Sequence, residues 1–423
     1  MSRCCLADIS EIITGPFGSQ LHESDYVSVG IPAIMPQNIG NRTLNYEGIA
    51  RITEEDAIRL SRYLVQTNDI VYARRGDVEK HAFITEKDER SICGTGCLRV
   101  RTTASNVYPA FLSHYLNRPE SKRWISQHAV GSNMPNLNTE ILGAVPIELP
   151  TYEVQKAIAN LLTSIDTKVG LNTDVCSELE SMAKTLYDYW FTQFDFPNAE
   201  GKPYRTSGGA MEWNKQLKRE IPKGWEAKPL SYVISSINTG LNPRDNFKLG
   251  NGDIQYITVK NLTTSGTIDF SGCDTVDEEA RAVIHNRSDI SVGDILFASI
   301  APLGRCYLIQ NFPENWDINE SVFSIRPDYS RMTSEYLYMY FMGDSFIKGA
   351  TSSSTGSIFK GIRINTLLDL IAVVPDKKVI DAFSAEIINL LRLKEQKNKE
   401  NMELTKLRDW LLPMLMNGQA VVE

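Results

Sequence analysis

Basic and amide side chains follow several of the short apolar runs in this chain. Arg74 and Arg75 come directly after the run Asp69–Ala73, and Arg305 follows the similar run Asp294–Ala298. Arginine can pair bidentately with the edge of guanine, and amide side chains can pair with adenine or contact phosphate. An ordinary solvated position on the surface is the alternative for each of them. The candidates for such contacts are Gln37, Asn38, Arg74, Arg75, Lys80, Asn133, Asn136, Lys260, Asn261, Arg305, Lys360 and Arg363.

Two small, polar loops, 131–136 and 352–357, contain or adjoin several of these candidates. Such loops let backbone amides approach an anion closely, and a solvated connection is the alternative. Asn138 and Asn365 follow the loops, and each precedes a short apolar run. We expect the side chain of each asparagine to accept a free backbone N–H in the first turn of a helix.

The motifs of the common catalytic classes do not occur in the sequence. There is no phosphate-binding Gly-rich loop, no Gly-x-Gly-x-x-Gly, no His-Glu-x-x-His, no Gly-x-Ser-x-Gly and no Asn/Asp-Pro-Pro-aromatic tetrad. A nuclease-like string joins Pro375-Asp376 to Glu395 and Lys397, but the last two fall inside an expected helix. We therefore predict no catalytic residues in this chain. A free-standing enzyme with an unrecognised site is the alternative.

The composition is that of an ordinary globular protein, with 42% hydrophobic and 23% charged residues among 423. No apolar run approaches the roughly 20 residues that span a bilayer, and no secretory leader is visible, so the cytoplasm is the expected location. Seven cysteines without secretory context indicate free thiols. Cys93 and Cys97 are expected to be buried in strands, with a metal site as the rejected alternative.

The net charge of −8 is unevenly distributed along the chain. Segments 1–150, 151–200, 201–375 and 376–423 carry net charges of −2, −5, −1 and 0. Near-neutral segments are expected to bind nucleic acid only weakly on their own, because binding depends on local lysines and arginines. Another protein would have to supply further phosphate contacts.

The chain contains an internal repeat at a shift of about 225 residues. The expected helices Tyr152–Phe191 and Lys377–Met416 are related by that shift. Upstream, Asp69–Ala73 matches Asp294–Ala298, and the segment containing Asn38 matches the one containing Asn261 at a shift of 223. Matches in the same order along both halves indicate a duplicated domain.

Apolar residues three and four apart predict that the two helices pair along a heptad seam. A pseudo-twofold axis between two copies would make the pair antiparallel. Polar residues at Asn172, Lys397 and Glu400 interrupt the seam, and a buried one would set its register. The predicted seam positions are Val154, Ile158, Leu161, Ile165, Asn172, Val175, Leu179, Met182 and Leu186 in the first helix, and Val379, Phe383, Leu390, Leu404, Leu407 and Leu411 in the second.

Each half outside these helices is a series of short apolar runs and helical patches, which predicts an α+β fold. The helical patches are Glu54–Leu64, Pro109–Gln127, Asp277–His285 and Thr333–Ile347. We expect two homologous α/β domains, related by a pseudo-twofold axis and joined by two long helices that form an antiparallel coiled coil. The expected divisions are a first domain at 1–150, a central helix at 151–196, a linker at 197–220, a second domain at 221–375 and a C-terminal helix at 376–423.

Several strings, taken in order, resemble the DNA-specificity subunits of type I restriction–modification systems. They are Asp69–Ala73, Gly293–Ala298, Val145–Pro150 running into Glu153–Ile158, and Leu407–Gly418, within the duplicated domain–helix plan. The resemblance covers essentially the whole chain. It implies a non-catalytic subunit whose two target-recognition domains each read one half of a split DNA sequence.

The resemblance also implies partners and cofactors outside this chain. The paired helices would dock two modification subunits, which bind S-adenosylmethionine and methylate adenine in double-stranded DNA. Two restriction subunits, which use ATP and Mg²⁺, can join such an assembly. A coiled-coil scaffold that binds protein and no DNA is the alternative function.

The sequence departs from the family pattern in two places. The first half lacks the Pro-x-Gly-Trp entry found at Pro222–Trp225, so we expect its first strand to be imperfect. The second helix begins Lys377-Lys378-Val379 instead of a Glu-x-Gln form, which argues against a shared role for Glu153 and Gln155.

Overall fold

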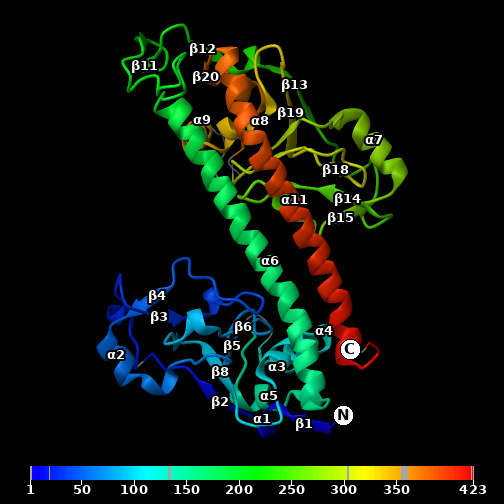
Figure 1. Ribbon diagram of the computed structural model, residues 1–423. Coiled ribbons are helices and arrows are strands. Elements are labelled where there is room, and N and C mark those ends of the chain that lie inside the picture. Colours follow the sequence, from blue (N-terminus) through cyan, green and yellow to red (C-terminus); the bar gives the residue numbers. More distant parts are fainter. Residues whose placement is uncertain are drawn as a thin grey trace. The chain divides into compact units, whose positions relative to one another are not determined.

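The computed structural model describes residues 2–18, 20–131, 135–302, 304–353, 361–420 and 422, and Figure 1 labels its elements. The chain forms two compact units, Met1–Val169 with Met402–Glu423 (unit 1) and Gly170–Asn401 (unit 2). The boundary between the units falls inside the two long helices, α6 (Tyr152–Tyr187) and α11 (Lys377–Met416). Each unit therefore contains one stretch of each long helix.

Unit 1 contains short strands in three sheets, with strand orders β2-β8-β5-β6, β4-β3-β7 and β1-β9. Its strands are β1 (Ser2–Cys5), β2 (Ser10–Thr14), β3 (Ile31–Ile34), β4 (Ala50–Ile52), β5 (Ile70–Ala73), β6 (His81–Phe83), β7 (Ile92–Cys93), β8 (Cys97–Thr102) and β9 (Pro146–Leu149). Its shorter helices are α1 (Leu6–Ile9), α2 (Glu54–Arg59), α3 (Pro109–Leu116), α4 (Pro119–His128) and α5 (Thr139–Gly143).

Unit 2 repeats these sheets as β13-β19-β16-β17, β15-β14-β18 and β12-β20, and adds the hairpin β10-β11. Its strands are β10 (Met211–Asn214), β11 (Arg219–Pro222), β12 (Glu226–Pro229), β13 (Ile234–Thr239), β14 (Ile254–Ile257), β15 (Asp274–Val276), β16 (Ile295–Ala298), β17 (Cys306–Leu308), β18 (Trp316–Ile318), β19 (Val322–Pro327) and β20 (Ile371–Val374). Its shorter helices are α7 (Glu278–Ser288), α8 (Ser334–Met342), α9 (Asp344–Ser353) and α10 (Ile364–Leu368).

The pairing registers confirm the duplicated α+β domain. Ile70 of β5 lies opposite Val100 of β8, and Ile295 of β16 lies opposite Ile325 of β19. The sheet β4-β3-β7 and its counterpart β15-β14-β18 each combine one antiparallel pair with one parallel pair. The arrangement of the two units about a pseudo-twofold axis remains a prediction.

Local sequence signals explain where the shorter helices begin and end. Thr53 caps α2 by accepting the Asp56 N–H, and Asp277 caps α7 by accepting the Ala280 N–H. Asn138 caps α5 as expected. The same expectation for Asn365 is wrong, because α10 begins at Ile364, so that Asn365 lies inside the helix and Arg363 occupies the cap position.

The expected helix Pro109–Gln127 is two helices, α3 and α4. Arg118, between them, is extended at φ −62° and ψ 148°. The residue before a proline disfavours helical geometry, because its backbone would clash with the proline ring, and here Pro119 starts the second helix.

The long helices pack antiparallel within each unit, as predicted. In unit 1, Asp166 of α6 contacts Arg408 of α11, and in unit 2 Asn172 contacts Asn401 while Glu180 contacts Lys394. Thus the α6 numbers rise as the α11 numbers fall. Asn172 is buried and donates to the partly buried Asn401 over 3.0 Å, so the polar break that it makes is an amide pair.

The predicted seam is partly displaced by one residue. Ile158, Ile165, Leu179 and Phe383 are buried as expected. Val154, Val175, Met182 and Leu407 are exposed, and Leu161, Leu186, Val379, Leu390, Leu404 and Leu411 are only partly buried. The buried positions in their place are Leu162, Cys176, Ala183, Ile380, Ile387, Leu391 and Lys394. Both rows of α6 contain apolar residues, so the periodicity alone did not separate them.

Two segments, the first strand and the predicted linker, are more ordered than the sequence indicated. Strand β1 pairs with β9 over its whole length, just as β12 pairs with β20, so the expected defect in the first strand is absent. The predicted linker 197–220 contains β10 and the first half of β11, and Phe196, just before it, stacks on Trp225 in the core of unit 2. Among the described residues, no helix is long and apolar enough to span a membrane.

Candidate nucleic-acid interface

Two loops of unit 1 meet at the end of β5 and bring three predicted candidates together. The Leu137 N–H donates to the Arg74 carbonyl over 2.8 Å, and Arg75 and Asn136 form an isolated antiparallel bridge. Asn136 also exchanges two backbone hydrogen bonds with Val130, at 2.9 and 3.0 Å. We call this junction of 74–76 with 135–137 corner 1. It holds Arg74, Arg75 and Asn136 on adjacent backbone, as a contact surface requires.

Unit 2 repeats the junction with the same backbone bond. The Ile362 N–H donates to the Ser299 carbonyl over 2.8 Å, and Ile300 bridges Gly361. We call this junction of 299–300 with 361–362 corner 2. The candidate Arg363 follows it directly and is exposed. The two corners thus share a backbone scaffold at a shift of 225 residues but differ in side chains.

Lys80 and Arg305 occupy equivalent ends of the hairpin loops that contain the corners. The Ala73 N–H donates to the Lys80 carbonyl over 3.3 Å, and the Ala298 N–H donates to the Arg305 carbonyl over 3.0 Å. The Lys80 ammonium lies 2.5 Å from an Asp77 carboxylate oxygen, which offsets its charge. Sequence reasoning had treated Lys80 and Arg305 separately and did not align them.

The side chains at the corners differ in the partners they have. Arg75 is exposed, whereas Arg74 and Arg305 are partly buried. The Nε atoms of Arg74 and Arg305 have no hydrogen-bond partner among the described residues. A buried guanidinium with an unused donor is unfavourable unless another group accepts from it. Asn133 and Lys360 lie outside the described residues.

Asn38 and Asn261 hold the framework instead of facing outward. Asn38 is 1% exposed; its Oδ1 accepts the Met35 N–H and its Nδ2 donates to the Asn45 carbonyl. Asn261 is 3% exposed and makes the equivalent bonds with Thr258 and Asp269. Because these amides are buried and engaged, the two residues do not fit the predicted role as base contacts. Their exposed neighbours Gln37 and Lys260 remain candidates.

A buried carboxylate precedes the strand that leads into each corner, and sequence reasoning missed the arginine that pairs with it. Asp69 receives a bidentate bond from Arg101 at 2.8 and 2.6 Å, and Asp294 receives one from Arg326 at 2.8 and 2.8 Å. The hydrogen bonds to these carboxylates raise the pKa of both arginines. Both pairs are related by a shift of 225, so the repeat itself contained the signal that would have found them.

The described residues contain no cluster of side chains suited to a metal ion. Cys93 and Cys97 lie in β7 and β8 and are buried, as predicted. Burial raises the pKa of the Cys93 thiol to about 12, which disfavours the thiolate that a metal would require. The nuclease-like Glu395 and Lys397 lie inside α11, where Glu395 accepts from the Tyr307 hydroxyl.

Known proteins match this chain along its length. Residues 3–181 match the family model of the type I restriction modification DNA specificity domain. The type I restriction enzyme HindI specificity subunit of Haemophilus influenzae is 22% identical, with 84% of this chain and 87% of that protein covered. The MjaIX specificity subunit of Methanocaldococcus jannaschii is 23% identical, over 99% of this chain and 93% of that protein.

A solved structure shows the same fold. The S subunit of a type I restriction–modification system from M. genitalium has a TM-score of 0.60 to this chain at 14% identity, covering 98% of this chain and 95% of that one. The family model, the full-length relatives and the duplicated fold agree. Along its length the chain is therefore similar to the DNA specificity subunits of type I restriction–modification systems, and its residues 3–181 match their DNA specificity domain.

Proposed function

We propose that this chain directs adenine methylation by reading a bipartite DNA target, with unit 1 reading one half and unit 2 the other. The observation that carries the proposal is the pair of corners. Their backbone bonds, Leu137 to Arg74 and Ile362 to Ser299, are equivalent, while their side chains differ. A repeated scaffold with different side chains is suited to placing two unlike recognition surfaces on DNA.

Within this proposal, corner 1 reads base edges through arginine. Arg75 is exposed, and arginine forms bidentate hydrogen bonds with guanine in the major groove. Corner 2 has Ser299 and Ile300 at the matching positions, with Arg305 and Arg363 nearby in sequence. We expect the two half-sites to differ accordingly. Gln37, Lys80, Asn136 and Lys260 are further proposed contacts to bases or phosphates.

The long helices are proposed to bind two modification subunits. On α6, the exposed apolar residues Leu171, Val175 and Met182 are spaced as one helical face, and Met182 is 55% exposed. Such a stripe on a helix that already packs a seam on its other side is suited to a protein partner. The modification subunits would contain S-adenosylmethionine, and restriction subunits joining them would use ATP and Mg²⁺. This chain would supply neither catalysis nor cofactor, and the complex would work in the cytoplasm.

The experiment is to coexpress the chain with the neighbouring modification subunit in a host free of DNA methylation. Single-molecule sequencing of the host genome then maps methylated adenines. We expect a split motif with two defined halves around a fixed gap. Copurification of the two subunits without any motif-specific methylation would contradict DNA reading and favour the scaffold function.

A further inference from the structure

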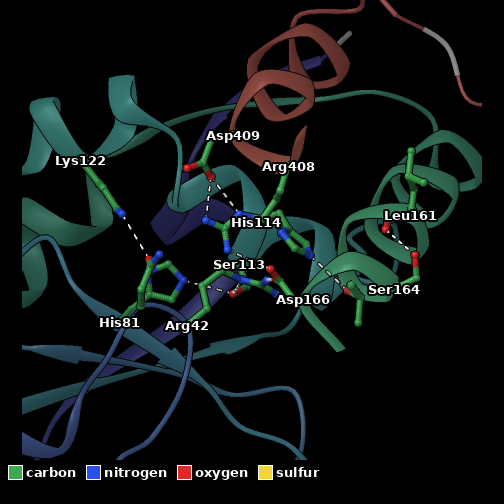
Figure 2. Close-up of polar contacts among 12 residues, drawn as sticks. Arg42, His81, Ser113, His114, Lys122, Leu161, Ser164, Asp166, Arg408 and Asp409 are labelled. Carbon is green, nitrogen blue, oxygen red and sulfur yellow. Dashed lines mark hydrogen bonds and ion pairs between the residues drawn. The ribbon is translucent and has the colours of Figure 1, made fainter. Parts of the chain in front are cut away.

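A charged cluster in unit 1 links the head of that unit, residues 2–150, to both long helices. Asp166 of α6 lies between two arginines, as Figure 2 shows. Arg408 of α11 donates to Asp166 over 3.1 Å, and Arg42 donates to the other oxygen of the same carboxylate. The cluster therefore joins three elements of unit 1 through one side chain.

Arg42 is buried for this contact. Its side chain is 8% exposed, and its Nε donates to the Ser113 hydroxyl over 3.0 Å. His81 approaches the same hydroxyl at 3.1 Å. Burying a guanidinium is costly unless it is paired and hydrogen-bonded, and Asp166 and Ser113 meet both needs. A solvent-exposed arginine in a loop would not need these two partners, because water would solvate its charge.

The backbone of Arg42 also departs from the ordinary. Its φ is 62°, in the left-handed region that non-glycine residues other than asparagine and aspartate seldom occupy. In this conformation, the Arg42 N–H donates to the His81 carbonyl over 2.8 Å, and its carbonyl accepts the Phe83 N–H over 3.3 Å. Both partners are in β6, which pairs with β5, the strand that leads into corner 1. Arg42 is thus connected to corner 1 through two adjacent strands.

Unit 2 ties the equivalent loop to its helices by different chemistry. Ser265 corresponds to Arg42 at the shift of 223 that relates Asn38 to Asn261. The Ser265 carbonyl accepts from the Lys394 ammonium of α11, which also lies 3.1 Å from the Glu180 carboxylate of α6. In both units, therefore, the loop after the buried asparagine contacts an ion pair between the two long helices. Because different residue types make this contact at the same position in the two units, we infer that it has the same role in both, which is to hold the loop on the long helices.

We propose that Arg42 is a positioning residue that fixes the head of unit 1 on the long helices and thereby limits the gap lengths that the complex accepts. This rests on the proposed function, because a gap has meaning only for a bipartite target. Arg42 would touch no base. It acts through β6 and β5 by holding corner 1 in one position on α6 and α11. Releasing it lets the head engage a half-site displaced by one base pair.

The test uses the complex of this chain with its modification subunit and a set of DNA duplexes. These have the mapped half-sites and a gap that is native, one base pair shorter or one base pair longer. Methylation rates are measured for the wild type, Arg42→Gln, Asp166→Asn and the double variant. The control is Arg90→Gln, which removes an exposed ion pair with Glu54 in the same head. Arg42→Lys retains the charge without the fork.

We expect the rate ratio of native to altered gap to fall about tenfold in both single variants, because a charge pair that fixes register has been lost. The double variant should fall no further than Asp166→Asn alone, since Arg42→Gln removes only one of the two arginine contacts that Asp166 makes. Base preference within each half-site should not change, Arg90→Gln should match the wild type, and Arg42→Lys should recover part of the ratio.

Two results would overturn the inference. One is an unchanged gap ratio in Arg42→Gln. The other is an equal fall in methylation on all duplexes for both Arg42→Gln and Arg42→Lys, which is the signature of general destabilisation. A wild-type complex that methylates without a bipartite motif would instead overturn the proposed function, and the inference with it.

Discussion

Corner 1 and corner 2 have the same framework contacts but different exposed side chains. Asp69–Arg101 and Asp294–Arg326 are bidentate pairs at the same shift of 225 residues, and the backbone bond that closes each corner is 2.8 Å in both units. The exposed positions beside them, Arg75 and Ile300, have nothing chemically in common. The two copies therefore share the contacts of their buried framework and differ in the side chains that face outward. Changes that affect the two kinds of position should have separable effects.

The largest effect is expected at the buried carboxylates. Asp69→Ala should destabilise unit 1 by about 3–5 kcal/mol, because it leaves Arg101 partly buried without its partner. Asp294→Ala should cost unit 2 less, since Arg326 keeps a 3.0 Å contact with Asp289. Hydrogen exchange of β5 and β16 measures both. Glu54→Ala, which breaks an exposed pair, is the control and should cost about 0–1 kcal/mol.

Acid should lower the stability of unit 1 more than that of unit 2. Burial, together with nearby Arg42, lowers the pKa of His81 to about 3 and that of His114 well below its usual value, both in unit 1. The unfolded chain binds protons at these histidines near pH 6.5 while the folded chain does not, so unit 1 loses stability as the pH falls below that value. His81 alone should cost about 2 kcal/mol at pH 5.

In unit 2, burial raises the pKa of Asp317 and of Glu395. The folded unit therefore binds protons more readily at these carboxyls than the unfolded chain does, so their contribution to stability grows as the pH falls. Hydrogen exchange at pH 7 and pH 5, corrected for intrinsic rates, should show weaker protection in unit 1 only. His81→Asn should reduce the difference, whereas the exposed His22→Gln should leave it unchanged. Equal loss in both units would contradict this account.

The outward positions should affect DNA and leave the fold intact. Arg75→Ala should weaken recognition of one base by about 1–3 kcal/mol and relax the motif at that position only. The half-site that unit 2 reads should be unaffected. Methylome sequencing of the variant measures this, with Arg90→Gln as control. Relaxation in the other half would show that the corners do not read separate half-sites.

The smallest effect concerns the seam, which is apolar in unit 1 at Ile158, Leu162 and Ile165 and contains an amide pair in unit 2 at Asn172 and Asn401. Replacing both asparagines by leucine should stabilise unit 2 by about 1 kcal/mol, because a buried polar pair usually fixes register at a cost in stability. Urea denaturation measures the change. Destabilisation would mean that the amide pair stabilises the seam outright.

Much of this arrangement could be predicted from the sequence, because each element expected in one half could be checked against the matching segment of the other. The matches around Asp69 and Asp294 predicted the duplicated domain, and the helical periodicity placed α6 and α11 within a few residues. The burial of Asn38 could not be predicted, since an amide in a turn suits both a cap and a contact. Nor could the Arg42–Asp166 pair, because its members are 124 residues apart and the matching contact in unit 2 uses other residue types, Ser265 and Lys394.

Because the last residues of α11 belong to unit 1, this unit is synthesised first but can complete its core only after unit 2 has been synthesised. Leu412, Leu415 and Met416 pack in the same core as Ile158 and Leu162, yet they follow the whole of unit 2 along the chain. On the ribosome, unit 2 can therefore be translated in full while the apolar face of α6 in unit 1 still awaits its partner. A truncated nascent chain should expose that face, so incomplete translation products are expected to engage chaperones through their first half.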